Sequence, residues 1–363
     1  MRWRLSLLAP IVGSLLVSVA GCAAPAGDDV GTSEARFSEG EAEVNTDGLN
    51  LREGPSTGTR VLAVMARGAR VLVRGEGQDG FVPVTFGDAQ GWAWSEYLTP
   101  VRPVQIDSLA VAVNALAAEA PQRSPGTDIA IAVQNLSTGE YAGAGDVERH
   151  VSASSAKAIW VAAALHAGAD LSDIARPIFK DSNNELSGTA IDRAGGCDAV
   201  NEFAWNAVGM DRTLLANWFA GRRSSNQGQL GGDNYFTAKD NVLFLTRLDR
   251  GEILDSGKKD QLETWMTWSP RSGYGGWLGT LLPEAARASM MHKAGWLPRE
   301  SYPEYATMNE LGIVQVPGGD RYAVSILARY GADYWGKQQS FLERASCVIY
   351  RSIAKDRSLG CRD

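Results

Sequence analysis

The pattern of apolar and polar residues divides the chain into an apolar start, a polar stretch and two regions with different periodicities. The apolar start is followed by a small, polar and acidic stretch, which predicts a flexible tether because it has almost nothing to bury. Apolar residues then recur often enough to form two folded regions, and prolines mark a linker between them. The predicted segments are residues 1–21, 22–40, 41–100, 101–107 and 108–363.

Residues 41–100 predict a small all-β barrel, because short β-type runs alternate with Gly, Asp and Asn clusters. Trp92, Trp94 and Tyr97 either line a peptide groove or fill the barrel core, and their spacing fits both. The predicted strands are 42–44, 49–51, 61–65, 69–74, 81–86 and 92–94.

Residues 108–363 predict an α+β fold, because strand-like runs at both ends enclose a mostly helical middle. The predicted helices are 108–120, 156–166, 199–208, 238–249, 259–267 and 337–354. The predicted strands are 128–134, 140–142, 288–293, 312–316 and 322–329.

The first residues have the layout of a secretory signal peptide, with arginines ahead of an apolar run. Its end, Val-Ala-Gly-Cys22, resembles the lipobox of bacterial lipoproteins, which implies export and a lipid on Cys22. An ordinary signal peptide or a membrane helix with an incidental cysteine are the alternatives. The run is short for a membrane span, and Pro10 and Gly13 interrupt it.

Charge and cysteine usage narrow the possible partners. The net charge is −7 and there are no Lys/Arg runs, which argues against nucleic-acid binding. Besides Cys22, Cys347 and Cys361 can close a C-terminal loop by a disulfide, which leaves Cys197 over. No CxxC pattern occurs, so we predict neither a metal nor another cofactor.

Two serine motifs can supply a nucleophile for acyl transfer. Ser56 sits in a GxSxG sequence, but it lies among short strands without a following helix, so we interpret it as a surface turn. The three histidines also show no acid partner in the sequence.

The SxxK motif occurs at Ser154, Ser256 and Ser352, and only the first begins a strongly apolar helix. Residues three apart share a helix face, so Lys157 can reach the Ser154 hydroxyl. Ser256 falls in a charged connector and Ser352 in the closing helix, where we expect both to be solvent-exposed.

Two further motifs follow Ser154 and Lys157 in order. They are Ser182-Asn-Asn184 and Lys293-Ala-Gly295. The succession SxxK, SxN and a KTG-like triplet resembles that of the serine β-lactamases and penicillin-binding enzymes, over nearly all of residues 108–363. This resemblance implies a β-lactamase-like domain with an antiparallel sheet and a helical subdomain. The segment GLNLREGPSTGTRVLAVMARGARVLV with GWAWSEYL resembles the bacterial Src-homology-3 domain, which implies a module that binds cell wall or peptides.

The resemblance to penicillin-recognising enzymes also implies a role for each motif residue. Ser154 would be the acylated nucleophile, Lys157 its base, and Ser182 a proton relay to the leaving nitrogen. Asn184 would bind the substrate amide, and Lys293 of the Lys293–Gly295 triplet would bind the substrate carboxylate. The backbone N–H groups of Ser154 and Trp296 would form the oxyanion hole.

Three positions depart from the family pattern. Ser224-Ser-Asn226 also fits SxN, and Ser182 follows Ser154 more closely than is usual, although its flanking sequence fits better. Ala294 replaces the hydroxyl residue of the third motif, and one hydrogen bond to a charged group is worth roughly 1.5–3 kcal/mol. Phe219 falls where related β-lactamases have the glutamate that activates the deacylating water, with Asp211 and Asp233 as substitutes on composition alone.

These observations predict an exported acyl-serine hydrolase that acts on a β-lactam or a D-Ala-D-Ala-like peptidoglycan peptide. We expect a membrane anchor through Cys22 and cell-wall binding through residues 41–100. The alternative is a wall-binding lipoprotein that does not catalyse or turns over slowly. The Src-homology-3-like segment and Ala294 permit this alternative, and the missing glutamate favours slow turnover or peptidase activity.

Overall fold

The computed structural model describes residues 40–100, 106–226, 233–271, 275–298, 306–330, 335–356 and 359–361. The chain forms two compact units, Met1–Arg102 and Pro103–Asp363. Cys22 and the predicted signal peptide lie outside the described residues, so the signal peptide and the lipid anchor stay predictions.

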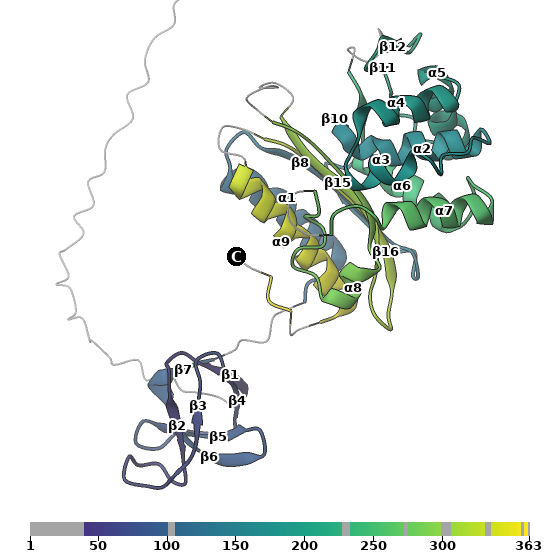
Figure 1. The fold of residues 1–363 in the computed structure, drawn as a ribbon. Helices are drawn as coiled ribbons and strands as arrows, with labels where there is room; N and C mark the ends of the chain where they lie inside the picture. The colour runs from purple at the N-terminus through teal and green to yellow at the C-terminus, as the bar shows by residue number, and fades with distance from the viewer. Residues whose placement is uncertain are drawn as a thin grey trace, which may run out of the picture. The chain divides into compact units, whose positions relative to one another are not determined.

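The small unit is an antiparallel sheet with strand order β3-β2-β6-β5-β4-β1-β7 (Figure 1). Alternate residues of its strands point inward to a core that includes Ala42, Leu51 and Val84. The strands are β1 (Gly40–Val44), β2 (Leu49–Arg52), β3 (Val61–Met65), β4 (Arg70–Val73), β5 (Phe81–Phe86), β6 (Ala89–Trp94) and β7 (Leu98–Pro100). The six predicted strands are therefore confirmed, and only β7 was missed.

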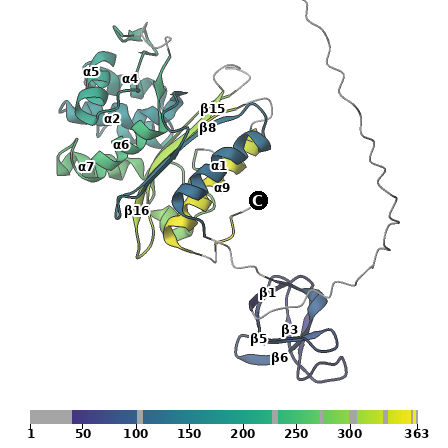
Figure 2. The ribbon, with the colours of Figure 1, turned by 180° about the vertical axis from the view of Figure 1, so that it is seen from behind.

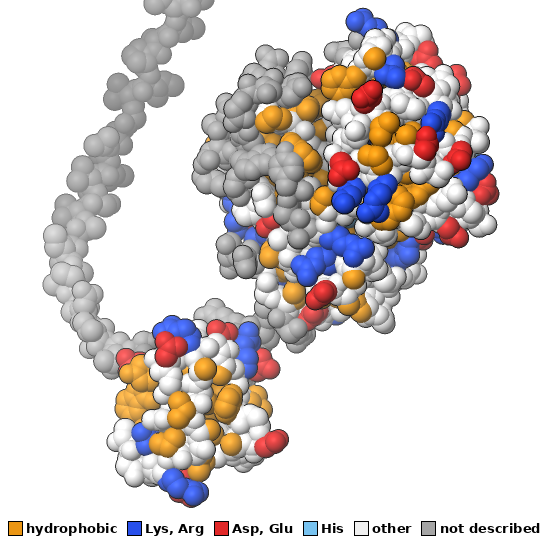
Figure 3. Space-filling model, in the orientation of Figure 1, with side chains coloured by type: hydrophobic (Ala, Val, Ile, Leu, Met, Phe, Trp, Pro, Cys, Tyr) orange, Lys and Arg blue, Asp and Glu red, His pale blue; other side chains and the backbone are white. Residues whose placement is uncertain are grey.

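The aromatic residues of β6 are only partly covered, although Trp94 packs against the core of the small unit. Gly91 and Ala93 are buried, whereas Trp92 and Trp94 are only half-buried and Tyr97 is exposed. Hydrophobic side chains also gather on the visible face of this unit (Figure 3). Its exposed large apolar residues are Val61, Leu62, Val64, Leu72 and Tyr97.

The large unit is built on a five-stranded antiparallel sheet with the order β14-β15-β16-β8-β9. Helices cover both faces of this sheet (Figures 1 and 2). The strands are β8 (Asp128–Asn135), β9 (Tyr141–Ala144), β14 (Met291–Leu297), β15 (Thr307–Gln315) and β16 (Arg321–Arg329). Strands from the first and last parts of the large unit thus meet in one sheet, as the predicted α+β fold requires.

One face of the sheet packs on α1 (Leu109–Arg123) and α9 (Trp335–Ala354), and α8 (Glu284–Ala288) lies at the end of α9 (Figure 1). The other face packs on the helical part of the unit. Its helices are α2 (Lys157–His166), α3 (Ala175–Lys180), α4 (Asn184–Arg193), α5 (Cys197–Glu202), α6 (Ala238–Asp249) and α7 (Ser256–Met266). Each face has its own apolar core, so consecutive residues of a strand enter different cores.

The helix predicted after Ser154 is the central helix of the helical part. Every residue of α2 from Lys157 to Leu165 is buried, including the lysine. A short 3₁₀ turn, η2 (Ala153–Ala156), precedes α2 and carries Ser154. An apolar helix buried on all sides gives its N-terminal residues a fixed position.

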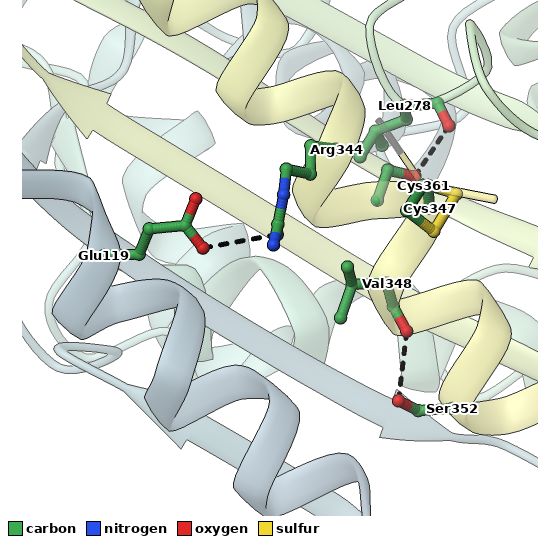
Figure 4. The surroundings of a disulfide bond; sticks show 8 residues. Glu119, Leu278, Arg344, Cys347, Val348, Ser352 and Cys361 are labelled. Atoms are coloured by element: carbon green, nitrogen blue, oxygen red, sulfur yellow. Dashed lines mark hydrogen bonds and ion pairs between the residues drawn. A yellow bond between two sulfur atoms is a disulfide. The ribbon is translucent and has the colours of Figure 1, made fainter. Parts of the chain in front are cut away.

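The C-terminal helix α9 carries the predicted disulfide. Cys347 and Cys361 are bonded, with Cα atoms 5.6 Å apart (Figure 4), and Cys197 is free and buried. The expectation of a solvent-exposed Ser352 is wrong, because this residue is buried and donates to the Val348 carbonyl at 3.0 Å. Serines in a helix interior commonly bond to the preceding turn in this way.

Three local predictions differ from the structure. Ser256 starts α7 instead of lying in a connector, although it is exposed as expected. The strand predicted from residue 288 starts at Met291, because α8 occupies the preceding residues. The short helix α3 was missed, and its length leaves little periodicity to detect. A helix was expected after Ser182, but α4 ends at Arg193, before Gly195 and Gly196, which the expected helix contained. Within the described part of the chain, no helix is both long and apolar enough to cross a membrane.

Candidate active site

Ser154 lies at the N-terminus of the central helix, at the edge of the large sheet. It is half-buried, and the preceding residue, Ala153, has a φ of 47°. Such a left-handed conformation costs a non-glycine residue roughly 1–3 kcal/mol and is found mostly at functional sites. The chain therefore turns sharply just before the serine and presents it at the start of a helix.

Lys157 is one turn beyond Ser154 and is fully buried. Its Nζ atom lies within hydrogen-bonding distance of three oxygen atoms: the Ser182 carbonyl at 2.5 Å, Ser182 Oγ at 3.1 Å and Asn184 Oδ1 at 2.7 Å. A protonated lysine can donate to all three, and a neutral amine to two of them at a time. The structure thus brings together the first and second motifs predicted from the sequence.

The second motif is held by the junction of α3 and α4. The Asn183 side chain caps α4 by accepting a hydrogen bond from the Leu186 N–H at 2.9 Å. Ser182 has a φ of 53°, a second strained backbone position at this site. This conformation lets both the carbonyl and the hydroxyl of Ser182 face Lys157.

The third motif lies on β14, which runs directly against the 3₁₀ turn of Ser154. A Cβ atom added to Gly295 would lie 2.5 Å from the Ser154 nitrogen and 2.3 Å from the Ser155 nitrogen, so only glycine fits. Asn309, opposite Gly295 on β15, donates to the Val151 carbonyl at 2.7 Å and fixes the same segment. Strand and turn are therefore held in close contact beside Ser154.

Lys293 completes the cluster from β14. Its Nζ atom donates to Ser182 Oγ at 3.2 Å and to the Ala294 carbonyl at 2.7 Å. Ser182 Oγ therefore lies within hydrogen-bonding distance of the Nζ atoms of both lysines. A hydroxyl in this position can pass a proton between Lys157 and a bound molecule.

The two lysines have different proton affinities. Burial, and secondarily the positive charge of Lys293, lowers the pKa of Lys157 to about 6. Burial also lowers the pKa of Lys293, to about 8, and the Glu310 carboxylate opposes this effect. Near pH 7 Lys157 is therefore mostly neutral and Lys293 mostly protonated. A neutral amine beside a serine can act as a base, and a buried cation can bind an anion.

Trp218 covers Lys157 from the loop between α5 and α6. The indole ring lies 5.8 Å from Lys157 Nζ, and its Nε1 donates to the Asn184 carbonyl at 3.0 Å. It also packs edge-on against Trp160 of α2, with ring centroids 4.5 Å apart. Its neighbour Phe219, which is predicted to fall where related β-lactamases have the deacylating glutamate, is 57% exposed. The aromatic side chain at the base is therefore Trp218.

No carboxylate contacts Lys157 among the described residues: its hydrogen bonds go to Ser182 and Asn184, and the one charge that shifts its pKa is Lys293. Asp211 is exposed, and Asp233 accepts a hydrogen bond from the adjacent Asn234 backbone. The structure thus gives neither aspartate a place beside the base.

Ser224, the alternative SxN serine, forms hydrogen bonds that hold a loop and has none with Lys157 among the described residues. It is buried, donates to Asp198 Oδ1 at 2.5 Å and accepts from Asn201 Nδ2 at 3.1 Å. Arg222, two residues earlier, pairs with Asp192 of α4 at 2.6 Å. These contacts hold the loop that carries Trp218, and the choice between the two serines falls on Ser182.

The described residues contain no group of three or more His, Cys, Asp or Glu side chains arranged to hold a metal ion. Ser56 is exposed in a turn and accepts a hydrogen bond from the Gly58 N–H at 3.2 Å, as expected for a surface position.

Comparisons with known proteins identify the family of the large unit and the fold of both units. The sequence profile of the β-lactamase enzyme family matches residues 166–353, just over half of the chain. The profile of the bacterial SH3 domain matches residues 47–99. No curated protein matches the chain.

Solved structures share the fold of the large unit. PBP-A is 18% identical with a TM-score of 0.56, and covers 71% of this chain and 99% of its own. A PBP-A variant in an acyl-enzyme complex with penicillin G is 18% identical with a TM-score of 0.57. The match covers 70% of this chain and 100% of the variant. A class A β-lactamase from Bacteroides cellulosilyticus is 17% identical with a TM-score of 0.56. The match covers 69% of this chain and 100% of that β-lactamase.

Proposed function

The chain belongs to the β-lactamase enzyme family, and on this basis we propose that Ser154 is acylated by β-lactams and by D-Ala-D-Ala-like peptides of the cell wall. The observation that carries the proposal is the buried Lys157, which is largely neutral near pH 7 and bonded to both Ser182 and Asn184. A neutral lysine one helical turn from a half-buried serine is an arrangement for activating that serine.

Acylation would begin when Ser154 Oγ attacks the substrate carbonyl carbon and Lys157 accepts the hydroxyl proton. The carbonyl oxygen becomes an oxyanion next to the backbone N–H groups of Ser154 and Trp296, where Gly295 permits the close approach of β14. The carbon–nitrogen bond then breaks. Ser182 gives its proton to the leaving nitrogen and recovers one from Lys157, to which it is bonded at 3.1 Å.

Two further residues would orient the substrate. Protonated Lys293 attracts the substrate carboxylate, and Ala294 contributes no hydroxyl to it, which weakens this contact. Asn184 holds the substrate amide while it accepts a hydrogen bond from Lys157 at 2.7 Å.

Deacylation would be slow. Hydrolysis of an acyl-serine needs a base that activates water, and an indole ring occupies the place beside Lys157. Trp218 has no proton-accepting atom, because its Nε1 is a donor and is bonded to the Asn184 carbonyl. The enzyme would thus behave as a penicillin-binding protein or slow peptidase, and as a poor β-lactamase.

The small unit would bring this activity to the cell wall. We propose that residues 41–100 bind peptidoglycan peptides through the exposed apolar side chains of the barrel, and that a lipid on Cys22 anchors the protein to the membrane. Incorporation of a labelled fatty acid into wild type and not into Cys22→Ser would support the anchor. Equal labelling of both would contradict it.

The central experiment follows the intact mass of the purified protein during incubation with excess penicillin, with Ser154→Ala as control. We expect a long-lived adduct of one penicillin on wild type and none on the control. Rapid, Ser154-dependent loss of penicillin without an adduct would refute slow deacylation. Absence of both adduct and penicillin loss would refute the acylation itself and favour a binding-only protein.

A further inference from the structure

The turn that carries Ser154 has no capping side chain of its own. Neither η2 nor α2 begins with a side chain that accepts a hydrogen bond from the first N–H groups. Helices commonly begin with such a cap, because these N–H groups have no partner inside the helix. Ala153, just before Ser154, also has the left-handed φ of 47°. A strained turn of this kind keeps its conformation only where the surrounding structure holds it.

Asn309 of β15 holds this turn from the sheet. Its side chain is completely buried, and its Nδ2 atom donates to the Val151 carbonyl at 2.7 Å. The Ser152 carbonyl lies 3.5 Å from the same nitrogen, at the outer limit of a hydrogen bond. Val151 and Ser152 directly precede Ala153, so the amide of Asn309 fixes the chain where it enters the sharp turn.

The neighbours of Asn309 in the sheet determine which way its amide points. The Ala328 backbone N–H on β16, which can only donate, lies 3.2 Å from Asn309 Oδ1. The Thr307 hydroxyl lies 2.9 Å from the same oxygen. Because the amide oxygen must face the Ala328 N–H, the NH₂ group must face the turn. Asn309 therefore connects the backbone of β16 to the backbone that leads to Ser154.

The other contacts of this segment come from the turn itself or from backbone groups. Ser155 Oγ donates to the Ser152 carbonyl at 2.6 Å, and the Ser152 N–H donates to the Asn234 carbonyl at 2.8 Å. Gly295 lies opposite Asn309 in the register of β14 and β15, and its lack of a side chain leaves room for the turn. Asn309 adds a side-chain anchor from the interior of the sheet.

We propose that Asn309 is a positioning residue for acylation, whose amide holds the strained turn so that Ser154 Oγ faces the substrate carbonyl. It acts through the backbone of Val151 and Ser152 and does not contact the reacting atoms. Its buried hydrogen bonds offset the cost of the left-handed conformation at Ala153. This inference deepens the proposed acylation mechanism and rests on it for its kinetic test.

The kinetic test compares wild type with Asn309→Ala in the two constants of penicillin acylation. The dissociation constant of the first complex reports the substrate contacts of Lys293 and Asn184, whereas the maximal acylation rate reports the position of Ser154. A misplacement of about 1 Å costs on the order of 10²-fold, so we expect the maximal rate to fall by about that factor. The dissociation constant should stay within about threefold of wild type.

Asn241→Ala is the matched control, because Asn241 is also a completely buried asparagine that bonds the sheet. Its Nδ2 atom donates to Ser325 Oγ of β16 at 3.1 Å, so its side chain bonds the sheet instead of the turn. This control should lose stability and keep both constants. A maximal rate of Asn309→Ala within about threefold of wild type would overturn the proposal. An equal fall in Asn241→Ala, or a weaker first complex with an unchanged rate, would overturn it too.

A second readout, hydrogen exchange, does not depend on acylation. In ¹⁵N spectra of the wild-type full chain, the side-chain N–H protons of Asn309 should exchange slowly, as those of a buried hydrogen bond do. In Asn309→Ala, the backbone amides of residues 151–155 should exchange about tenfold faster or more, while those of residues 158–165 keep their rates.

Rapid exchange of the wild-type Asn309 side chain would overturn the inference, even if Asn309→Ala does not fold. Unchanged exchange of residues 151–155 in a folded Asn309→Ala protein would overturn it as well. If both exchange results are as expected but neither wild type nor any variant is acylated, only the proposed function fails.

Discussion

Replacing Gly295 by alanine tests the contact between β14 and the turn of Ser154. The new Cβ atom would lie 2.3 Å from the Ser155 nitrogen and 2.5 Å from the Ser154 nitrogen. Ordinary contact begins near 3.4 Å, so strand and turn must separate by about 1 Å. A misplacement of about 1 Å at a reacting group can cost on the order of 10²-fold in rate. We therefore expect Gly295→Ala to slow penicillin acylation about a hundredfold.

The assay measures the second-order acylation rate by intact mass, together with the free energy of unfolding in urea. Overpacking costs roughly 1–3 kcal/mol, so a control of similar strain is needed. Gly145→Ala provides it, because its Cβ would lie 2.8 Å from the Ile129 carbonyl at the opposite edge of the sheet. This control should lose stability and keep its acylation rate. Acylation of Gly295→Ala within twofold of wild type would refute the proposed geometry.

Three further predictions concern the base, the acyl-enzyme and the C-terminus. Trp218→Glu should accelerate deacylation, by up to about 10²-fold if the new carboxylate activates water. Phe219→Glu, at a 57% exposed position, should not accelerate it, and release of bound penicillin followed by mass would show the difference. Acylation should fall about tenfold per pH unit below pH 6 as Lys157 takes up a proton, and a rate that stays constant to pH 5 would exclude it as the base. Cys361→Ser opens a disulfide between residues 14 apart and should lower the free energy of unfolding by roughly 3 kcal/mol, measured in urea; an unchanged midpoint would contradict this.

The parts of the site that are short in sequence could be predicted from it. The SxxK spacing places Ser154 and Lys157 on one helical turn, and the apolar residues that follow predict the buried helix. The fold class followed from the order of helical and strand-like segments. These features depend on local periodicity, which a single sequence contains.

Features that depend on distant contacts could not be predicted with the same certainty. The sequence left Ser182 and Ser224 open, and the hydrogen bonds of Lys157 distinguish them. The sequence singled out Phe219, whereas the aromatic ring beside Lys157 belongs to Trp218. Trp218 pairs with Arg222 in a two-stranded sheet, and side chains alternate along such strands, so neighbouring residues face opposite sides. The contact between His292 Nδ1 and Glu310 Oε1, 2.5 Å apart, required the register of β14 and β15.

The proposed slow deacylation is consistent with an uncharged Trp218 beside Lys157. A carboxylate in place of the indole would lie beside Lys157, raise its pKa and weaken it as the base for acylation. An apolar ring avoids that charge, but it also provides no base for water. Among the residues that the structure describes, Glu310 is the one carboxylate that shifts the pKa of either lysine, and it raises that of Lys293. Rapid acylation near neutral pH and slow hydrolysis would thus follow from the same distribution of charge.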